Sequence, residues 1–445
     1  MPDQAPRRRR YALVGTGSRA EMFVRSLHDH SESAELVAFA DVNQSRMDAH
    51  NAWLATAGAS PVPTYRAGDF AIMLDKERVD VVLVTSVDRT HDEYIVAALQ
   101  AGCDVVTEKP MTTDVPRCQR ILDAVAETGR QVTVAFNYRY NPLHEKVREV
   151  LAAGEIGEIG SVHFEWLLDV RHGADYFRRW HRDKANSGGL MVHKASHHFD
   201  LVNWWLDAVP VEVMAYGRLF FYGAEGRRHG YARDYDRAHG ATSAADDPFA
   251  IDLAANPHLR ALYLDAEAED GYHRDQNVFA PGVTIEDDMS VLARYSSGAT
   301  MTYHLTAYSP WEGYRVMFNG SRGRLELHVV ENDFVSPAGA RGVKGALHGV
   351  EAAIEAGSTR ITVHPFWEQP REVPVPGHTR EGHGGADARM TAVLFGGEND
   401  PMGREASARD GALALLTGLA ANRSFETGLP VQVADLLTAD LLHLA

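Results

Sequence analysis

The sequence predicts an α/β fold with two domains, a doubly wound parallel sheet at the N-terminus and a larger α+β domain after it. Three observations lead to this prediction. The chain has 445 residues, which is too many for one small core. Short apolar runs alternate with helical stretches up to about residue 140, and longer segments of alternating apolar and polar residues follow. With 45% hydrophobic and 24% charged residues, the composition excludes a disordered or fibrous chain.

The N-terminal domain is predicted from short apolar runs, several of them Val-rich, of the kind that parallel sheets bury on both faces. Helical stretches separate these runs and supply the crossovers that parallel strands need. The expected strands are Tyr11–Val14, Glu35–Ala40, Val79–Thr85, Asp104–Thr107 and Gln131–Ala135, and the expected helices include Arg19–His30 and Glu93–Ala101. We expect this domain to span residues 11–138, after a basic disordered tail over residues 1–10.

The C-terminal domain, residues 139–445, is predicted to contain a mostly antiparallel sheet with one polar or partner-covered face. Its expected strands are Ser161–Leu168, Val211–Phe221, Met289–Tyr295, Ala299–Ala307 and Arg324–Val330. Residues 222–282 are polar and long for a loop, so they predict an insertion, lid or interface arm, with a short helix in Pro248–Leu262. A helix over Arg404–Asn422 and an extended segment over Leu429–Val433 complete the prediction.

The charge of the chain argues against nucleic acid and membrane surfaces as partners. Lys and Arg number 44 against 61 Asp and Glu, a net charge of −17 that repels phosphodiesters and anionic lipid. No apolar run is long enough to span a bilayer, and the basic run Arg7–Arg10 is not followed by the apolar core of a signal peptide. The two cysteines, Cys103 and Cys118, are expected to be free thiols in a reducing compartment. We therefore expect a cytoplasmic protein.

A dinucleotide site is predicted at the turn after the first strand, where the chain reads Gly15-Thr16-Gly17-Ser18-Arg19-Ala20. In this pattern the first glycine permits a tight turn, the second lets the backbone approach a pyrophosphate, and Ala20 keeps the helix close to the sheet. Asp41 ends the second strand, where a carboxylate would accept hydrogen bonds from ribose hydroxyls. This carboxylate favours NAD over NADP, although Arg46 lies near enough to leave NADP open.

Several ordered motifs resemble the glucose–fructose oxidoreductase / inositol dehydrogenase / MocA (Gfo/Idh/MocA) family. The quoted motifs are Glu108-Lys109-Pro110, Ser86-Val87-Asp88-Arg89-Thr90-His91, Asn137-Tyr138-Arg139-Tyr140-Asn141-Pro142, Gly154-Glu155-Ile156-Gly157, Gly188-Gly189 with His197 and Asp200, and Asn319-Gly320-Ser321-Arg322-Gly323. The resemblance implies a Rossmann domain followed by an α+β domain whose open sheet forms a homo-oligomer interface. It also implies that Lys109 lies beside the nicotinamide and hydrogen-bonds the reacting hydroxyl. Cofactor contacts are expected from Gly15, Thr16, Gly17, Ser18, Arg19, Ala20, Asp41, Ser86, His91, Glu108, Lys109 and Asn137.

The segment from Gly188 to Asp200 carries the second part of the resemblance. His197 occupies the family's histidine position, and an imidazole suits general acid–base work on a hydroxyl proton. His193 stands one helical turn earlier, where the family has an aspartate, so the usual pairing of an acid with His197 is in doubt. His193 is expected to contact substrate or to share the proton relay. His198 is expected to point elsewhere, and Asp200 to brace the helix.

A basic run between Arg171 and Lys184 precedes this segment. Arginines suit bidentate recognition of carboxylate, sulfonate or phosphate, which favours an anionic sugar, but a charge run paired with surface acids remains an equal alternative. Substrate contacts are expected from Lys109, Arg139, Arg178, Arg179, Trp180, His181, His193, Lys194 and His197. No metal site is expected, because the acidic run Asp265–Asp270 lacks a calcium-loop spacing. A loop at His383–Asp387 is expected near the cleft.

The first functional hypothesis is hydride transfer between a secondary hydroxyl of a sugar and NAD, with His197 as the proton acceptor. The resemblance also allows an NAD-dependent glycoside hydrolase, which would act by transient oxidation at C3, elimination, hydration and re-reduction, for example on sulfoquinovosides or uronides. A third possibility is a sensor without catalysis, against which the presence of both Lys109 and His197 argues.

Overall fold

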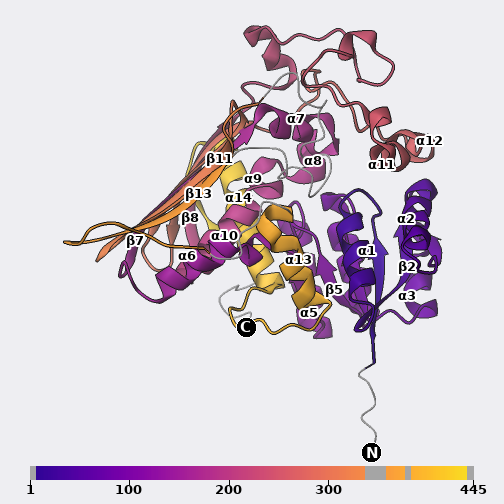
Figure 1. Ribbon diagram of the computed structural model, residues 1–445, viewed down its shortest axis with the longest axis horizontal. Helices are drawn as coiled ribbons and strands as arrows, with labels where there is room; N and C mark the ends of the chain where they lie inside the picture. Colours follow the sequence, from indigo (N-terminus) through magenta and orange to yellow (C-terminus); the bar gives the residue numbers. More distant parts are fainter. Residues whose placement is uncertain (1–6, 336–356, 376–381, 438–445) are drawn as a thin grey trace, which may run out of the picture.

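The computed structural model describes residues 7–335, 357–375 and 382–437. Two sheets organise the chain, a smaller one in the N-terminal third and a larger one whose helices lie between the sheets (Figure 1). Hydrophobic residues from both parts form a continuous buried core, so the two domains pack directly on each other.

The first sheet has seven strands in the order β15-β6-β5-β4-β1-β2-β3. Strands β1 to β6 are parallel, and only β15 is antiparallel to its neighbour. The strand order reverses between β1 and β4, and ligands of such sheets bind at that point, outside the carboxyl ends of the strands. The strands are β1 (Arg9–Val14), β2 (Ala34–Asp41), β3 (Thr64–Arg66), β4 (Val81–Val84), β5 (Asp104–Thr107), β6 (Val132–Val134) and β15 (Ala406–Ser407). Its helices are α1 (Ala20–Asp29), α2 (Gln44–Thr56), α3 (Phe70–Lys76), α4 (His91–Gln100) and α5 (Val115–Thr128).

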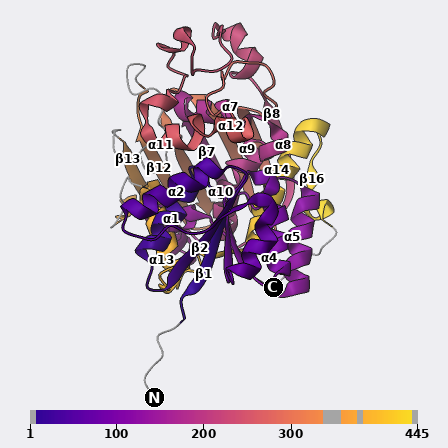
Figure 2. The ribbon, with the colours of Figure 1, turned by 90° about the vertical axis from the view of Figure 1, so that its right-hand side faces the viewer.

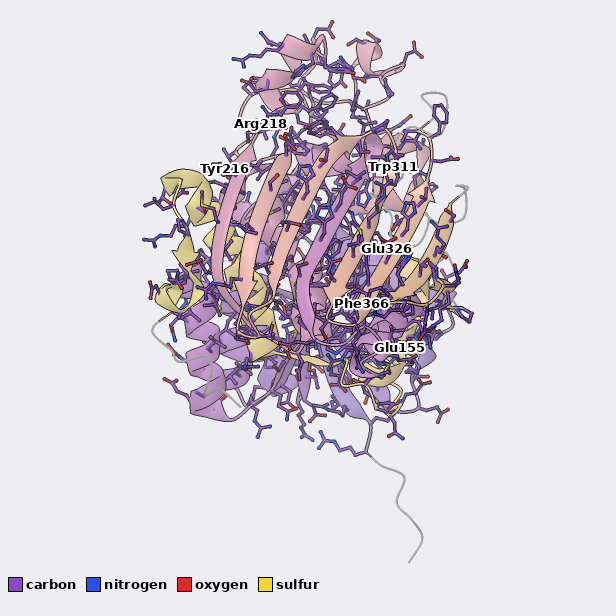
Figure 3. The ribbon with its side chains drawn as sticks, turned by 90° about the vertical axis from the view of Figure 1, so that its left-hand side faces the viewer. Glu155, Tyr216, Arg218, Trp311, Glu326 and Phe366 are labelled. Atoms are coloured by element: carbon purple, nitrogen blue, oxygen red, sulfur yellow. The ribbon has the colours of Figure 1, made fainter. Side chains whose placement is uncertain are left out.

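The second sheet has nine strands in the order β14-β13-β12-β11-β7-β10-β9-β8-β16. Only β7 and β10 are parallel, and the other pairs are antiparallel as predicted. The strands are β7 (Ile159–Asp169), β8 (Pro210–Arg218), β9 (Asp288–Tyr295), β10 (Thr300–Ser309), β11 (Glu312–Gly320), β12 (Gly323–Asn332), β13 (Ser358–Pro365), β14 (Arg371–Glu372) and β16 (Val431–Gln432). Buried and exposed residues alternate along them, and in the described residues the outer face carries no helix (Figure 3).

The helices of the second domain cover the inner face of its sheet and carry the candidate site. They are α6 (Pro142–Ala152), α7 (Val170–Arg178), α8 (Lys184–Ser187), α9 (Leu190–His193), α10 (Ser196–Leu206) and α14 (Ala408–Thr427). Helix α14 begins with a capping box between Ser407 and Asp410 and ends at Gly428 in a left-handed conformation. Because α14 contacts α9, α10 and β8, it fixes the short active-site helices against the sheet.

The chain returns to the first domain after the second sheet. Helix α13 (Gly382–Leu394) packs Ala386, Met390 and Val393 into the core of the parallel sheet, and β15 pairs with β6. The loop predicted at His383–Asp387 is therefore wrong, since these residues belong to α13. The paired glycines favoured a loop, but burial of the following apolar residues outweighs that local preference.

The segment between β8 and β9, which contains residues 222–282, has little regular structure. Its turns are η5 (Gly223–His229), η6 (Thr242–Ala244), η7 (Leu253–Ala255), α11 (Pro257–Leu259), η8 (Arg260–Leu264) and α12 (Glu267–Asp270). The helix predicted in Pro248–Leu262 is broken, because Asp252 and Asn256 each cap a new turn. The second half of the insertion extends to the first domain, where α11 and α12 lie beside α2 (Figures 1 and 2).

The predicted disordered tail is wrong for its last residues, and positions 1–6 lie outside the described residues. Arg9 and Arg10 begin β1, while Arg7 pairs with Asp80 at 2.9 Å and Arg9 with Asp104 at 2.7 Å. Carboxylates at the N-terminal ends of neighbouring strands thus order the basic run. Cys103 and Cys118 are buried free thiols. Among the described helices, none combines the length and apolar character that crossing a bilayer requires.

Candidate active site

A cavity of about 590 Å³ lies between the carboxyl ends of the parallel strands and the inner face of the second sheet. Its walls come from turns after β1, β2, β4, β5 and β6, from α7 to α10, and from the insertion. Predicted site residues that line it are Gly15, Gly17, Ser18, Arg19, Asp41, Ser86, His91, Glu108, Lys109, Asn137, Arg179, Trp180, His181, His193, Lys194 and His197. The fold thus brings most of the predicted residues into one space.

The glycine-rich turn follows β1 and faces this cavity. Gly15 has φ +90°, and a Cβ atom there would lie 2.4 Å from the backbone of Ser86, so the turn can approach β4 only with glycine. At Gly17 a Cβ would meet only the Tyr263 hydroxyl within 4 Å, at 3.8 Å. Thr16 and Ala20 are buried behind the turn and do not line the cavity. The turn therefore leaves backbone next to space, as a bound pyrophosphate requires.

Asp41 ends β2 with its carboxylate held by the same turn. One carboxylate oxygen accepts hydrogen bonds from the backbone N–H and the hydroxyl of Thr16, the latter at 2.8 Å. The other accepts from the N–H of Asn43 at 2.9 Å. Asp41 is only 7% exposed and lines the cavity, so it stands where an adenosine ribose is expected.

A buried ionic network closes the floor of the cavity. Arg19 donates to Glu108 and also approaches Asp387 at 3.3 Å, while the Asn137 amide donates to Asp387 at 2.7 Å. Despite burial, the charges of Glu108 and Asp387 raise the pKa of Arg19 above its usual range. Asp387 comes from α13, so a residue far along the chain orders two predicted cofactor contacts.

His91 ties the turn after β4 to the end of β5. Its ring nitrogens lie 2.9 Å from the carbonyl oxygen of Pro110 and 3.1 Å from that of Ser86. The Ser86 hydroxyl contacts the Thr90 hydroxyl at 2.8 Å. Burial lowers the pKa of His91, while its contacts with the two carbonyl oxygens act to raise it, and the ring links the two turns beside Lys109.

Lys109 and His193 meet in the centre of the cavity. The Lys109 ammonium donates to the backbone oxygen of His193 at 3.2 Å and lies 3.5 Å from His193 Nε2. Burial lowers the pKa of Lys109 to about 8, while the charges of Glu108 and Asp88 act to raise it. A buried lysine that can lose its proton near neutral pH is suited to proton or hydrogen-bond chemistry.

The carboxylate partner of His193 is Asp88, which the sequence reasoning did not select. His193 Nδ1 lies 2.6 Å from Asp88 Oδ2, and both groups are buried. Burial, reinforced by the charges of Lys109, Arg179 and Lys194, holds the pKa of His193 well below its usual value. Burial raises the pKa of Asp88, and the nearby Lys109 ammonium opposes that change. The signal available in the sequence was that His193 stands where the family has an aspartate, which left its carboxylate partner to be found elsewhere in the chain.

His197 lies deeper on an aromatic wall. Its ring stacks on Tyr138 with centroids 4.3 Å apart, and it is 5% exposed. Lys194 donates to the Tyr138 hydroxyl at 3.1 Å and lies 4.8 Å from the centre of the Trp166 ring. His198 points away from the cavity and contacts the Tyr303 hydroxyl at 2.7 Å. The wall continues through Tyr314, which stacks on Trp166 at 4.3 Å.

Two predicted substrate contacts do not line the cavity. Arg139 is buried in a bidentate ion pair with Asp200, at 2.6 and 2.8 Å, so Asp200 braces the site from behind. Arg178 is buried against Asp175 at 3.1 Å and donates to the backbone oxygen of Phe249 in the insertion at 3.0 Å. The reason is the same for both: a buried guanidinium needs carboxylate and carbonyl partners, and these lie inside the protein.

Of the other residues in the basic run, some hold the insertion in place and others line the cavity. Arg182 donates to insertion carbonyls, including those of Asn277 and Ala280. Arg179 lines the cavity but is paired with Asp175 at 2.8 Å, and His181 stacks on Trp180 with centroids 3.5 Å apart. The run therefore holds the insertion as much as it faces a ligand. Sequence reasoning also missed Glu312, which lines the cavity and contacts His172 at 2.7 Å.

Comparison with known proteins matches both halves of the chain to one family. Residues 9–136 match its NAD-binding Rossmann fold, and residues 148–433 match its C-terminal α/β domain. The chain belongs to the Gfo/Idh/MocA oxidoreductase family. A Bacillus subtilis (strain 168) member, YteT, which is named only as an oxidoreductase, is 34% identical over 95% of this chain and 97% of its own length.

Three further proteins share less of the sequence with this chain than YteT does. An inositol 2-dehydrogenase of Rubrobacter xylanophilus is 28% identical over 46% of this chain and 54% of its own length. Solved structures share the fold: the WlbA dehydrogenase of Bordetella pertussis, in complex with NADH and UDP-GlcNAcA, is 20% identical over 98% of this chain and 100% of its own, with a TM-score of 0.62. An oxidoreductase domain protein of Kribbella flavida is 17% identical over 96% and 99%, with a TM-score of 0.64.

Proposed function

We propose that this Gfo/Idh/MocA protein transfers hydride between NAD and a secondary hydroxyl of a sugar or sugar derivative. The observation that carries the proposal is the meeting of Lys109 with His193 and Asp88 in the same cavity as the glycine-rich turn. A proton acceptor and a hydrogen-bond donor within reach of one position are what removal of a hydroxyl proton requires. The inositol 2-dehydrogenases among its relatives support a polyol-like substrate.

The residues around the turn fit a dinucleotide. Gly15 and Gly17 leave the backbone accessible, Asp41 is placed for a ribose, and Glu108, Asn137 and Arg19 form an ordered floor. When bound, NAD supplies the carbon that accepts hydride from the sugar. We propose NAD over NADP because a buried carboxylate at the end of β2 disfavours a 2′-phosphate.

Each residue at the centre of the cavity has a role in this proposal. The Lys109 N–H donates to the reacting oxygen and stabilises its developing negative charge. His193 Nε2 accepts the hydroxyl proton, while Asp88 holds Nδ1–H and stabilises the imidazolium that forms. The expectation from the sequence gave the proton to His197. We place His197 with Tyr138 against the sugar ring instead, because its ring stacks on Tyr138 while Asp88 orients the ring of His193.

The basic run between Arg171 and Lys184 favours an anionic sugar less strongly than its sequence suggested. Arg178 and Arg182 are committed to protein contacts, so Arg179 and Lys194 are the members of the predicted cation set that remain at the cavity beside Lys109. Glu312 and Glu331 line it as well. This mixture supports a polyhydroxylated substrate with at most one acidic group.

The function can be tested by a screen of neutral sugars, inositols, uronates and their aryl glycosides with NAD, following NADH and released aglycone together. We expect NADH formation with at least one free sugar or polyol, and its loss in Lys109→Ala. Release of aglycone without net NADH would replace the dehydrogenase by the redox-neutral glycosidase mechanism. Failure of every compound in both readouts, in protein that binds NAD, would contradict the proposal.

We further propose that the protein forms a homo-oligomer in the cytoplasm through the outer face of its large sheet. That face carries the exposed side chains of Tyr216 on β8 (Figure 3), at 68% exposure, and of Leu292 on β9, at 51%. Exposed apolar side chains among polar ones, on a sheet face that no described helix covers, support a protein partner.

A further inference from the structure

The insertion contacts the first domain at the start of α2. The Glu269 carboxylate accepts hydrogen bonds from the backbone N–H groups of Gln44 at 2.7 Å and Ser45 at 2.8 Å, and from the Ser45 hydroxyl. It also pairs with Arg66 at 3.1 Å. Free N–H groups at a helix start are anion-binding positions, and here a carboxylate of the same chain fills them.

Arg46, the residue that left NADP open in the sequence, is engaged by the same segment. Its guanidinium pairs with Asp270 at 2.7 Å, and its Nε donates to the backbone oxygen of Leu262 at 2.9 Å. Arg46 is 8% exposed and lines the cavity, with the rings of Tyr263 and Tyr272 within 6 Å of its guanidinium carbon. Its charge is therefore already balanced inside the protein.

Two further contacts fix the segment beside the dinucleotide turn. The Asn43 amide donates to the backbone oxygen of Ala266 at 2.9 Å. The Ser18 N–H donates to the Tyr263 hydroxyl at 3.0 Å. The segment thus spans the distance from the glycine-rich turn to the first turn of α2, on either side of Asp41.

These contacts lie where the extra phosphate of NADP would need partners. In Rossmann domains the residues just after the second strand meet the 2′ position of the adenosine ribose, and an arginine there accommodates a 2′-phosphate. Here Asp41, Glu269 and Asp270 supply three negative charges against the two of Arg46 and Arg66. Carboxylates engage the helix-start donors and pair with both arginines, so a 2′-phosphate would meet repulsion from three negative charges.

We propose that residues 256–272 of the insertion form part of the cofactor site and exclude NADP, with Glu269 and Asp270 as the residues that determine this specificity. The inference rests on the proposed function, because it assumes that a dinucleotide binds at the glycine-rich turn. In most Rossmann domains, residues at the end of the second strand select NAD or NADP. Here part of that selection would come from a segment that lies more than 200 residues later in the chain.

The test is a binding measurement by calorimetry with NAD and NADP, without any sugar. We expect wild-type protein to bind NAD about 100-fold or more tightly than NADP. In the double variant Glu269→Gln and Asp270→Asn we expect this ratio to fall about tenfold or more, mainly through tighter NADP binding, because two charges are removed and Arg46 is released. A gain of affinity cannot arise from misfolding.

Glu267→Gln is the matched control. Glu267 lies on the same α12 helix and loses the same charge, but its partner is Arg237 within the insertion. We expect its NAD-to-NADP ratio to remain that of the wild type. Equal wild-type affinities, or an unchanged ratio in the double variant, would overturn this inference and leave the proposed function standing. Binding of neither dinucleotide would instead overturn the proposed function itself.

Discussion

The carboxylate that holds His193 comes from the turn after β4, 105 positions earlier in the chain. This contact fixes one nitrogen of the imidazole and directs the other toward Lys109. His197, one helical turn later, packs on Tyr138. The two histidines have similar sequence surroundings, yet their environments assign them different tasks.

Substitution of the two histidines separates these tasks. We expect His193→Ala to lower kcat by about 10²–10⁴-fold, the usual contribution of a general base. Asp88→Asn should lower kcat in the same direction by a smaller factor, because the amide keeps the shape but loses the charge. His197→Ala should mainly raise KM. Steady-state kinetics decide the assignment, and a larger kcat loss for His197→Ala than for His193→Ala would return the base to His197.

The pKa of Lys109 predicts an alkaline limit to activity. Burial lowers this pKa to about 8, so the ammonium is present below that pH and is lost above it. Since the charged form stabilises the developing oxyanion, kcat/KM for sugar oxidation should decline above about pH 8. Lys109→Arg should be slower but free of this decline, since a guanidinium stays protonated. The measurement is a pH profile of both proteins, and an equal decline in the arginine variant would assign it to another group.

Helix packing behind the site sets the position of α9. At Gly418 on α14 a Cβ atom would lie 2.3 Å from the backbone oxygen of Met191, so α9 can approach only a glycine. At Gly411 on the same helix a Cβ would meet side-chain atoms rather than backbone, those of Val134 at 2.7 Å and Met111 at 3.2 Å. Replacement of Gly418 would therefore push against the backbone of α9, whereas replacement of Gly411 would push against side chains.

Gly418→Ala is expected to displace α9 and His193 with it. Overpacking against backbone costs about 1–3 kcal/mol, which exceeds the gain in helix propensity from alanine, so both the Tm and kcat should fall. Gly411→Ala is the control and should change the Tm less and leave kcat near the wild-type value. Thermal unfolding and kinetics on both variants provide the comparison. A wild-type kcat in Gly418→Ala would show that α9 does not need this close contact.

At the scale of elements, the sequence predicted what local periodicity encodes. Strand β5 was predicted with its observed bounds, and β1, β2, β4 and β6 within two residues at each end. The predictions missed β11 and β13, which pair with β12 on its two sides. Residues at helix starts in the insertion were also missed, since Asp252 and Asn256 act through capping rather than through hydrophobic period.

For the whole molecule, the uncovered sheet predicts assembly. Light scattering on purified protein should give a mass of a dimer or larger. Leu292→Arg on β9 should shift it toward the monomer, because a charge replaces an apolar contact. Ile72→Arg on α3 is the matched control, since Ile72 is 59% exposed but lies in the first domain. A monomeric wild type at micromolar concentration would contradict the proposal.

The net charge of the whole chain does not describe the charge around the cavity. The net charge of −17 indicates the partners that the surface repels. The cavity has its own balance, with Lys109, Lys194 and Arg179 close to Asp88, Glu312 and Glu331. Most arginines of the basic run that suggested an anionic ligand instead pair with Asp175 or donate hydrogen bonds to backbone carbonyls of the insertion.

The sequence alone determined the two sheets, the glycine-rich turn and the family, because these depend on residues that are neighbours along the chain. Lys109 was found in the same way, from the strand that ends beside it. Only the tertiary structure decided that Asp88 holds His193, that Asp387 orders Arg19, and that Glu269 fills the start of α2. Those pairs lie 105 or more residues apart, so only the folded chain brings their members within hydrogen-bond distance.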